Sequence, residues 1–477
     1  MIDLVIPTDI IQSINTQQAW HYLLLPFAKS DTEIRCYIAK ENHHGSLEEE
    51  LEVLLGIPVV LEITPTDELK KAIAQYYRKP TDSRSQPSAA GFDINDSQNI
   101  LNNLIKEAKM LNSSDIHLEP YEHKARIRVR IDGKLVERYN IDIKQYPSLV
   151  NKIKIQSSLD ISEKRLPQDG RIFIKNESLG QLDLRVSVLP TLHGEKIVLR
   201  ILGSDNLDIS MEQLGFGKSD LALYLESVHR PSGIVLVSGP TGSGKTTTLY
   251  ATLQLLNQSI RNILTIEDPI EYTLEGINQV QLKENIGLDF PAAMRTFLRQ
   301  DPDIIMVGEI RDKSTAEMAI RASLTGHLVL STIHTNSAWG IVARLVDMGI
   351  PSYLLADTLN AAVAQRLVRL LCNNCKTATS LDKKAFPRGF KTPNNLKSYY
   401  VANGCEDCFY TGYRGRKAIY EIIPIDETLS FHIKQTDMNV KQILTEKGHA
   451  SLADNALKLV SSGLTSPEEV YPILSSS

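Results

Sequence analysis

Residues 239–246 have the sequence GPTGSGKT, which fits the phosphate-binding pattern G-x-x-x-x-G-K-[ST]. The apolar run 234–237 before them predicts a buried strand, and residues 247–256 after them predict a helix. A strand, this loop and a helix, in that order, are the context in which the pattern holds a phosphate. Glycines let backbone amides surround phosphate oxygens, and the start of the helix adds a favourable partial positive charge. The flanking elements argue against the alternative, a chance match in a glycine-rich turn.

The pattern also predicts the ligands of the loop. Lys245 is expected to reach the β- and γ-phosphates of ATP, and the Thr246 hydroxyl is expected to hold Mg²⁺. The residues predicted to bind the nucleotide are Gly239, Pro240, Thr241, Gly242, Ser243, Gly244, Lys245, Thr246 and Thr247.

The composition is that of a globular protein, with 23% charged and 42% hydrophobic residues. A net charge of −5 gives no electrostatic reason to expect a nucleic acid as partner. The first residues lack the layout of a signal peptide, and no apolar run approaches the ~20 residues that span a bilayer. We therefore expect a cytoplasmic protein whose membrane contacts are peripheral.

Changes in composition divide the 477 residues into several parts. Residues 1–76 carry no obvious catalytic group, and 77–97 are expected to form a flexible linker because they are rich in Pro, Ser, Arg and Asp. Residues 98–202 mix helical and strand patterns and predict a small α+β domain. A glycine-containing hinge, 203–216, leads into a nucleotide domain at 217–477.

Periodicity predicts the elements of these parts. Helices are expected at 46–55, 66–77 and 99–111, and residues after 409 are expected to be largely helical and without chemistry. Strands are expected at 125–131, 182–188 and 196–201 in the small domain, and at 234–237, 263–266, 304–307 and 328–333 in the nucleotide domain. Short apolar strands that alternate with amphipathic helices predict a parallel sheet with helices on both faces, hence an α/β fold.

Three carboxylates, Glu267, Asp268 and Glu271, stand at the end of a predicted strand. In open parallel sheets the ligand lies beyond the carboxyl ends of the strands, so these acids are expected to face the phosphate loop. They would serve water bound to Mg²⁺ or an attacking water. The alternative is a helix N-cap with solvated acids.

Glu309 follows another apolar strand, 304–307. Most proteins with this loop carry an Asp at the end of that strand, whereas here Gly308 precedes Glu309. The metal is then expected to be held mainly by Thr246 and through waters, and Glu309 becomes the strongest candidate to orient the attacking water. Its alternative role is a structural pair with a nearby Arg.

Histidines stand at both ends of the predicted strand 328–333. Lone histidines are more often structural than catalytic, but His327 and His334 are candidates for sensing the γ-phosphate because they stand at strand ends beside the predicted phosphate site.

The chain has five cysteines, four of them in two C-x-x-C pairs. In a reducing cytoplasm, Cys372, Cys375, Cys405 and Cys408 predict a structural tetrahedral Zn²⁺ site. The residues between the pairs exceed the usual spacing, which predicts a protruding finger. Free thiols are the alternative, and Cys36 is expected to be simply packed.

Together these segments resemble the secretion-motor ATPases, the family of the type II secretion ATPase (the E component) and the type IV pilus assembly ATPase. The phosphate loop, the acidic segment 265–271, the run 298–312 and the histidine segment 325–338 occur in the family's order. Residues 114–120 (SDIHLEP) and 166–171 (LPQDGR) match the domain that precedes the motor, and the four cysteines are typical of the secretion and pilus-assembly branches.

The resemblance implies a RecA-like motor domain that includes a zinc insertion at 372–408 and C-terminal helices at 409–477. A smaller α+β (PAS-like) domain and an N-terminal docking domain would precede it. It implies a homohexamer at the cytoplasmic side of an inner membrane, which binds docking and platform proteins there and uses ATP hydrolysis to assemble a pseudopilus or pilus. It further makes Arg130, and less so Arg128, a candidate charge-stabilising finger, whereas from the residues alone the arginine face of 125–131 would be a solvated surface.

Three alternatives remain at this point. Residues 23–28 loosely resemble the start of the secretion ATPase, which favours type II secretion over pilus assembly. A switch that binds ATP without hydrolysing it is opposed by the presence of Glu309. A conjugation-type nucleic-acid motor is opposed by the acidic balance and by the lack of interleaved aromatic and basic residues.

Overall fold

The structure is a computed structural model that describes residues 6–11, 13–30, 32–45, 47–77, 100–176, 180–202, 210–390, 392–393, 396–437 and 440–475. The chain divides into two compact units. The first comprises Met1–Ser204, Cys372–Cys375 and Asn403–Arg414, and the second comprises Asp205–Leu371, Lys376–Ala402 and Gly415–Ser477. The predicted linker 77–97 lies outside the described residues from 78 onward, as does 203–209 of the predicted hinge.

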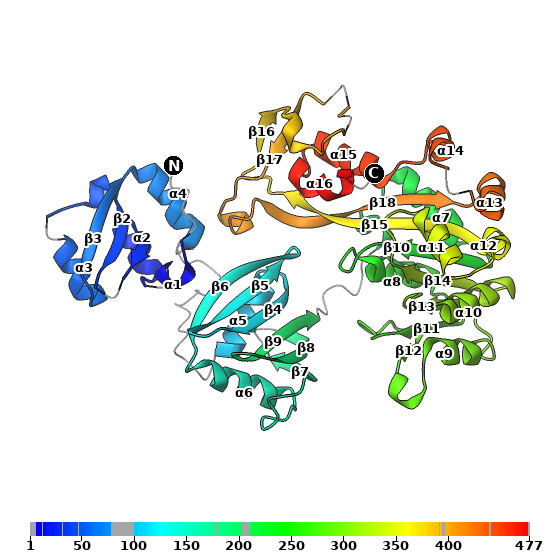
Figure 1. Cartoon of the computed structure of the whole chain (residues 1–477), viewed down its shortest axis with the longest axis horizontal. Helices are drawn as coiled ribbons and strands as arrows, with labels where there is room; N and C mark the ends of the chain where they lie inside the picture. Colours follow the sequence, from blue (N-terminus) through cyan, green and yellow to red (C-terminus); the bar gives the residue numbers. More distant parts are fainter. Residues whose placement is uncertain are drawn as a thin grey trace. The chain divides into compact units, whose positions relative to one another are not determined.

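The N-terminal part of the first unit is a three-stranded sheet in the order β1-β2-β3 (Figure 1). Its elements are α1 (Thr8–Ile11), α2 (Thr16–Tyr22), β1 (Leu24–Lys29), β2 (Ile34–Ala39), α3 (Leu47–Leu55), β3 (Val59–Thr64) and α4 (Thr66–Tyr76). The two helices expected in this part are confirmed as α3 and α4. Cys36 is fully buried in the apolar core beneath the sheet, and burial raises the pKa of its thiol to about 12.

The rest of the first unit contains a six-stranded antiparallel sheet in the order β6-β5-β4-β9-β8-β7. Its elements are α5 (Ile100–Met110), β4 (Ser113–Pro120), β5 (Lys124–Ile131), β6 (Lys134–Asp142), α6 (Tyr146–Gln156), β7 (Gln168–Asn176), β8 (Gly180–Thr191) and β9 (Gly194–Leu202). The apolar side chains of the strands pack on α5 and α6, which leaves charged side chains on the opposite face. Asp132 and Gly133, in the turn between β5 and β6, have φ of 46° and 87°, which is typical of a tight hairpin turn.

The second unit is built on a seven-stranded sheet in the order β12-β11-β13-β14-β10-β15-β18. All neighbouring strands from β12 to β15 in this order pair in parallel, and apolar side chains form a cluster on each face of the sheet. Helices therefore cover both faces (Figure 1). The α/β fold class and the parallel sheet are confirmed.

The elements of this sheet follow the predicted alternation. The strands are β10 (Gly233–Ser238), β11 (Ile263–Glu267), β12 (Asn278–Gln281), β13 (Ile304–Val307), β14 (Leu328–Ile333), β15 (Leu359–Leu371) and β18 (Tyr413–Pro424). The helices are α7 (Lys218–Val228), α8 (Lys245–Leu256), α9 (Phe290–Phe297), α10 (Lys313–Leu324), α11 (Gly340–Asp347), α12 (Ser352–Thr358), α13 (Glu427–Lys434), α14 (Lys441–Glu446), α15 (Leu452–Ser461) and α16 (Pro467–Ser475).

Two expectations about the C-terminal part need correction. Helices α13 to α16 lie after residue 409 as expected, but the strand β18 lies there too. This strand completes the sheet, and its side chains alternate between the two apolar clusters, with Ile419 and Ile423 in one and Tyr420 and Ile422 in the other. The segment between the cysteine pairs does not simply protrude. It forms the hairpin β16 (Thr377–Ser380) and β17 (Ser398–Val401), and its Phe386, Leu396 and Tyr399 join the core of the second unit.

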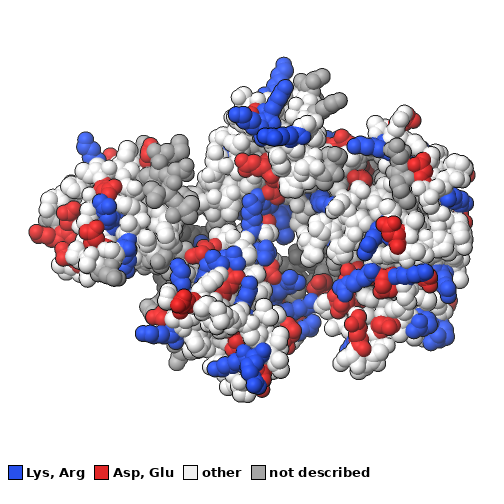
Figure 2. Space-filling view, in the orientation of Figure 1, with Lys and Arg blue, Asp and Glu red and all other residues white. Residues whose placement is uncertain are grey.

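The outer surface of this hairpin segment is basic. Lys383, Lys384, Arg388 and Lys397 are exposed there, and Figure 2 shows basic side chains gathered over the segment. Elsewhere on the face shown, acidic and basic side chains are interspersed. In the described part of the chain, no helix is both long enough and apolar enough to cross a membrane.

Candidate nucleotide and metal sites

The phosphate loop connects β10 to α8 at the carboxyl edge of the seven-stranded sheet. Gly239 has φ of 152°, and a Cβ there would lie 2.4 Å from the carbonyl oxygen of Gln365, so no larger residue fits. Gly244 caps α8 with φ of 85°, which aims the first amides of the helix at the loop. The local backbone therefore fits the phosphate cradle that the sequence predicts.

Lys245 is buried at the start of α8 and closes the loop on itself. Its Nζ donates hydrogen bonds to the carbonyl oxygens of Gly239 at 2.8 Å and Pro240 at 3.0 Å. Burial lowers the pKa of Lys245, the negative charge of Glu309 opposes that change, and the positive charge of Arg366 adds to it. Lys245, Glu309 and Arg366 therefore belong to one electrostatic site.

Two further residues of the loop have atoms suited to a ligand. Among the described residues, the buried Ser243 hydroxyl has no hydrogen-bond partner. Such an orphaned polar group is costly unless something binds it. Thr246 is exposed in the first turn of α8, where its hydroxyl can reach a metal ion beside the phosphates. The loop thus fits the predicted ATP and Mg²⁺.

Glu309 lies just beyond the end of β13, two strands from β10 in the sheet. Its carboxylate pairs with the Arg311 guanidinium and lies 3.4 Å from Nε2 of His334, and its side chain is 17% exposed. A Cβ on Gly308 would lie 3.3 Å from the Ile266 carbonyl oxygen, so glycine suits this close approach between β11 and β13. Glu309 thus lies at the carboxyl ends of the strands, as the phosphate loop does. It also makes the ion pair with an Arg that the sequence analysis gave as its alternative role.

The three acids after β11 do not share one environment. Glu267 is 3% exposed and accepts hydrogen bonds from Tyr250, from Thr265 at 2.7 Å and from Gln279 at 3.1 Å. Burial and the Glu267 charge raise the pKa of the Tyr250 hydroxyl, so Tyr250 stays a donor to Glu267 at ordinary pH. Asp268 is instead partly exposed, 3.8 Å from Arg311. The backbone amide of Glu271 donates to the Tyr250 hydroxyl at 3.3 Å, so Glu267 and Glu271 flank Tyr250, whereas Asp268 faces Arg311. Glu267 is thus held in a buried hydrogen-bonded network, and its catalytic role stays a prediction.

The two histidines lie at opposite edges of the sheet. His334 follows β14 and lies 3.4 Å from Glu309, and its role as a sensor of the γ-phosphate stays a prediction. His327 precedes β14, and the length of that six-residue strand, roughly 20 Å, separates it from the carboxyl edge. Its Nδ1 lies 2.8 Å from the Ala322 carbonyl oxygen at the end of α10. The expectation that His327 faces the phosphate loop of its own sheet is corrected, because the amino ends of parallel strands meet at the opposite edge.

Arg130 and Arg128 lie on the charged face of the six-stranded sheet in the first unit. Arg130 pairs with Asp115 at 3.3 Å and donates to the Gly133 carbonyl oxygen at 2.9 Å, while Arg128 pairs with Glu119 at 2.7 Å. The Arg130 side chain is 33% exposed. Its role toward a nucleotide stays a prediction.

The sequence did not single out three polar residues of the site, Gln365, Arg366 and Glu421. Gln365 donates from Nε2 to the Ser243 carbonyl oxygen at 2.8 Å and accepts from the Thr248 hydroxyl at 2.9 Å, which ties β15 to the phosphate loop. Arg366 follows it on β15. Glu421 lies on β18 and accepts hydrogen bonds from the amides of Ala338 and Leu452. The polar pair at 365–366, directly after the apolar run 361–364, was the available signal.

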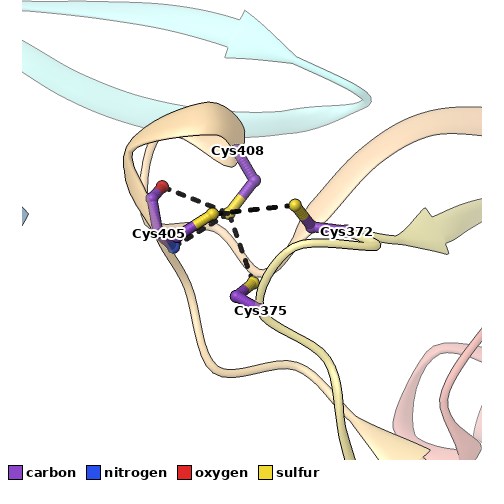
Figure 3. Close-up of side chains that lie close together, drawn as sticks. All are labelled: Cys372, Cys375, Cys405 and Cys408. Atoms are coloured by element: carbon purple, nitrogen blue, oxygen red, sulfur yellow. Dashed lines mark hydrogen bonds between the residues drawn. The ribbon is translucent and has the colours of Figure 1, made fainter.

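The four predicted metal ligands converge at one point (Figure 3). Cys372 and Cys375 follow β15, Cys405 and Cys408 precede β18, and the four sulfur atoms lie within 4.8 Å of one another. The Sγ atoms of Cys372 and Cys405 are 3.7 Å apart, and those of Cys375 and Cys408 are 3.8 Å apart. Tetrahedral zinc with bonds of about 2.3 Å requires sulfur–sulfur distances of about 3.8 Å. The donor set and its spacing therefore fit Zn²⁺, and the four cysteines form no disulfide.

Comparison with known proteins yields consistent matches. The family model described as "Type II/IV secretion system protein" matches residues 93–472. The type IV pilus assembly ATPase PilB of Myxococcus xanthus is 41% identical over 493 aligned positions, covering 98% of this chain and 87% of that relative. The type II secretion system protein E of Dickeya dadantii is 41% identical over 443 positions, covering 88% of each chain. The crystal structure of the pilus retraction motor PilT with bound ADP superposes with a TM-score of 0.53 at 26% identity, covering 78% of this chain and 95% of that one.

Proposed function

The chain belongs to the type II/IV secretion system protein family and is an ATP hydrolase, and from this premise we propose that it is the hexameric motor of a type II secretion system. ATP hydrolysis would power pseudopilus assembly and protein export from the cytoplasmic side of the inner membrane. The observation that carries the enzymatic part is the convergence of Lys245, Glu309 and His334 at one edge of the sheet. The relative named protein E, which aligns with 88% of this chain, supports the assignment to secretion.

In the proposed mechanism, Lys245 exchanges its two carbonyl partners for the β- and γ-phosphate oxygens of ATP. Both carbonyls belong to the same loop, so this exchange also opens the cradle for the phosphates. Thr246 holds Mg²⁺, which neutralises phosphate charge when bound. Glu309 orients the attacking water, and the contact of His334 with Glu309 keeps that carboxylate pointing into the crevice.

The zinc site is proposed to be purely structural. Four cysteine ligands leave no open position for water, so the site can stabilise but not catalyse. It joins the end of β15 to the start of β18, and these strands are neighbours in the motor sheet. Removal of the metal is therefore expected to loosen one edge of that sheet.

Partners are proposed on the same premise. Residues 1–76 would dock on an inner-membrane protein, and the ring would act on a platform protein in that membrane. The basic surface over β16 and β17 is compatible with such a location. Arg130 would supply a guanidinium to the nucleotide from the domain that precedes the motor.

Type IV pilus assembly is the second candidate function. The observation in its favour is that the Myxococcus pilus ATPase aligns with 98% of this chain, including the N-terminal part, whereas the Dickeya secretion relative aligns with 88%. Both machines would use the same ATPase chemistry, so the site does not separate them.

The test is a deletion of the gene in its source bacterium, with two readouts, enzymes exported to the medium and pili on the cell surface. Wild-type protein should restore export, and Lys245→Ala should not. Arg321→Gln, an exposed residue in the last turn of α10 near the opposite edge of the sheet, is the matched control and should behave as wild type. Restoration of pili with unchanged export would reject secretion in favour of the second candidate.

A further inference from the structure

Arg366 occupies a position beside the phosphate loop that no part of the proposed mechanism uses. β15 pairs in parallel with β10, and Ser238 is in register with Ala364. Gln365 therefore stands level with Gly239, the first residue of the loop, and Arg366 comes next, at the carboxyl edge of the sheet. The close approach of Gly239 to the Gln365 carbonyl oxygen fixes this strand against the loop.

The hydrogen-bond partners of the Arg366 guanidinium are neutral. Its Nη1 donates to the Gln365 carbonyl oxygen at 3.0 Å, and its Nη2 donates to the Asn336 carbonyl oxygen at 2.8 Å. Within the described residues no carboxylate forms an ion pair with Arg366, and Glu421 acts on it only through its charge. Burial lowers the pKa of Arg366. The guanidinium is therefore a half-buried cation with no carboxylate in direct contact among the described residues.

Other arginines of the same unit show that this arrangement is not the rule. Arg369, three residues further along β15, pairs with Glu469 at 3.0 Å, and Arg311 pairs with Glu309. A partly desolvated charge without a partner costs free energy that an anion would recover. At Arg366 the adjacent structure is the phosphate loop, where Lys245 likewise has no anionic contact within hydrogen-bonding distance among the residues that the structure describes.

We propose that Arg366 binds the terminal phosphate of ATP held by the phosphate loop of the same chain. The proposal rests on the nucleotide site described above. A guanidinium can donate two parallel hydrogen bonds to phosphate oxygens, which suits a group that must distinguish ATP from ADP. Lys245 and Arg366 then approach the phosphates from two neighbouring elements, α8 and β15.

The hydrogen bond from Arg366 to the Asn336 carbonyl oxygen would link phosphate binding to other parts of the second unit. Asn336 belongs to the loop after β14 that also carries His334, the contact of Glu309. At its other end, this loop donates the Ala338 amide to Glu421 at 3.0 Å, and the second oxygen of Glu421 accepts the first amide of α15, from Leu452, at 3.3 Å. Arg366 thus joins the phosphate site to the loop that positions His334 and, through Glu421, to the C-terminal helices.

The test compares two nucleotides in binding experiments with the full chain and Mg²⁺, namely ADP and the non-hydrolysable ATP analogue adenylyl imidodiphosphate. Arg366→Gln should weaken binding of the analogue about 10- to 100-fold, the loss expected for charge-assisted hydrogen bonds, while ADP affinity changes less than about twofold. Arg366→Lys should recover part of the difference, because it keeps the charge but not the fork. Arg321→Gln is the matched control and should leave both affinities unchanged.

An equal loss for both nucleotides would show that Arg366 only supports the fold or the loop, and no loss for either would show that it does not touch the phosphates. A change in sedimentation without a difference between the nucleotides would show that a second copy of the chain supplies its counter-ion. Each of these results overturns the proposal. Phosphate release by the wild type tests hydrolysis separately: if it is absent while the two affinities still diverge, the proposed motor function fails and the Arg366 assignment stands. If the wild type binds neither nucleotide, both fail.

Discussion

On the charged face of the six-stranded sheet, Glu119 pairs with three cations, Arg126 at 3.0 Å, Arg128 at 2.7 Å and Lys196 at 3.0 Å. At the carboxyl edge of the seven-stranded sheet, Lys245 and Arg366 donate hydrogen bonds only to carbonyl oxygens, as far as the described residues go. The first arrangement has an anion that is fully neutralised by protein, and the second has cations that are not. Both sets of side chains are partly or fully withdrawn from water.

The difference distinguishes a face that is stable by itself from a site that is completed by a ligand. A carboxylate with three cationic donors gains nothing more from a small ion, because its lone pairs are already used. Two cations bonded to backbone carbonyls can exchange these partners for phosphate oxygens at little structural cost. We therefore infer that the charged side chains around Glu119 stabilise the first unit, whereas Lys245 and Arg366 in the second unit serve to bind a ligand.

The cysteine cluster is expected to depend most strongly on a bound ligand. Four thiolates within 4.8 Å of one another would repel, so the cluster is complete only with a cation. Replacement of Cys405 and Cys408 by Ser should reduce zinc from about one per chain to none. Structural zinc sites contribute binding free energies on the order of 10 kcal/mol, so the expected change is the largest proposed here.

Elemental analysis and thermal unfolding measure that change. Cys36→Ser, which alters a buried cysteine far from the cluster in sequence, is the control for general thiol effects and should keep its zinc. Four titratable thiols in a zinc-free wild-type protein would reject the site.

Arg130 is the residue of the charged face that we expect to bind a group outside the first unit. Its pairing with Asp115 leaves a third of the side chain exposed, so the guanidinium is available to another group. Arg130→Ala should leave ATP binding intact and reduce turnover by about 10³- to 10⁵-fold if it stabilises the transition state. Arg126→Ala is the matched control, because Arg126 lies on the same face and is committed to Glu119.

Mixing experiments separate the two routes by which Arg130 could act. If it acts on a neighbouring subunit, Arg130→Ala mixed with Glu309→Gln should regain part of the activity, since some interfaces then carry both intact residues. No mixture above the sum of the two variants would exclude the route between subunits, and wild-type turnover of Arg130→Ala alone would dismiss the residue.

Much of the fold could be predicted because burial leaves a simple mark in the sequence. The strands β10, β11, β13 and β14 are buried along their whole length and are mostly apolar, as expected for strands covered on both faces. The strand β4 was missed because one of its faces carries Asp115, His117 and Glu119, so its apolar content is low. The strand β18 was missed because its apolar residues serve both clusters, and a short apolar run alone does not distinguish a strand from a buried helix.

The site was predictable where a residue follows the end of a strand. Glu309 and His334 do so, and both reach the crevice. His327 precedes its strand, and strand direction alone would have placed it at the opposite edge. Gln365 and Arg366 do not follow the end of a strand, because they lie within β15, which continues beyond the end of β10. Their role depends on register between two strands that are distant along the chain.

Glu309 and Glu267 allow the same comparison within the motor sheet, because they lie at the carboxyl ends of the neighbouring strands β13 and β11. Glu309→Gln should leave ATP binding intact and lower turnover by 10²- to 10³-fold, about 2.7–4 kcal/mol, because a water-orienting charge is lost. Glu267→Gln replaces one of the two buried oxygens that accept three hydrogen bonds by an NH2 donor, so it should mainly lower the melting temperature. Phosphate release and thermal unfolding of both variants are the measurements. If Glu309→Gln kept more than about a tenth of wild-type turnover, the catalytic assignment would move to Glu267 or Glu271.

Glu119 gives the smallest expected effect, and its substitution tests directly whether the three cations around it stabilise the charged face of the six-stranded sheet. Burial would raise the pKa of its carboxyl, but hydrogen bonds from Arg128, Lys196 and Arg126 outweigh burial and hold the pKa at about 2. A carboxyl whose folded pKa is depressed contributes stability above its unfolded pKa of about 4.3, and this stability is lost as pH falls toward 2. Glu119→Gln should therefore lower the free energy of unfolding by at most about 3 kcal/mol at pH 6, and the deficit should shrink between pH 4.5 and 2. Denaturant unfolding at several pH values measures it, with the exposed Glu122→Gln as control, and a deficit that does not change with pH would show that the three cations do not hold Glu119 ionised.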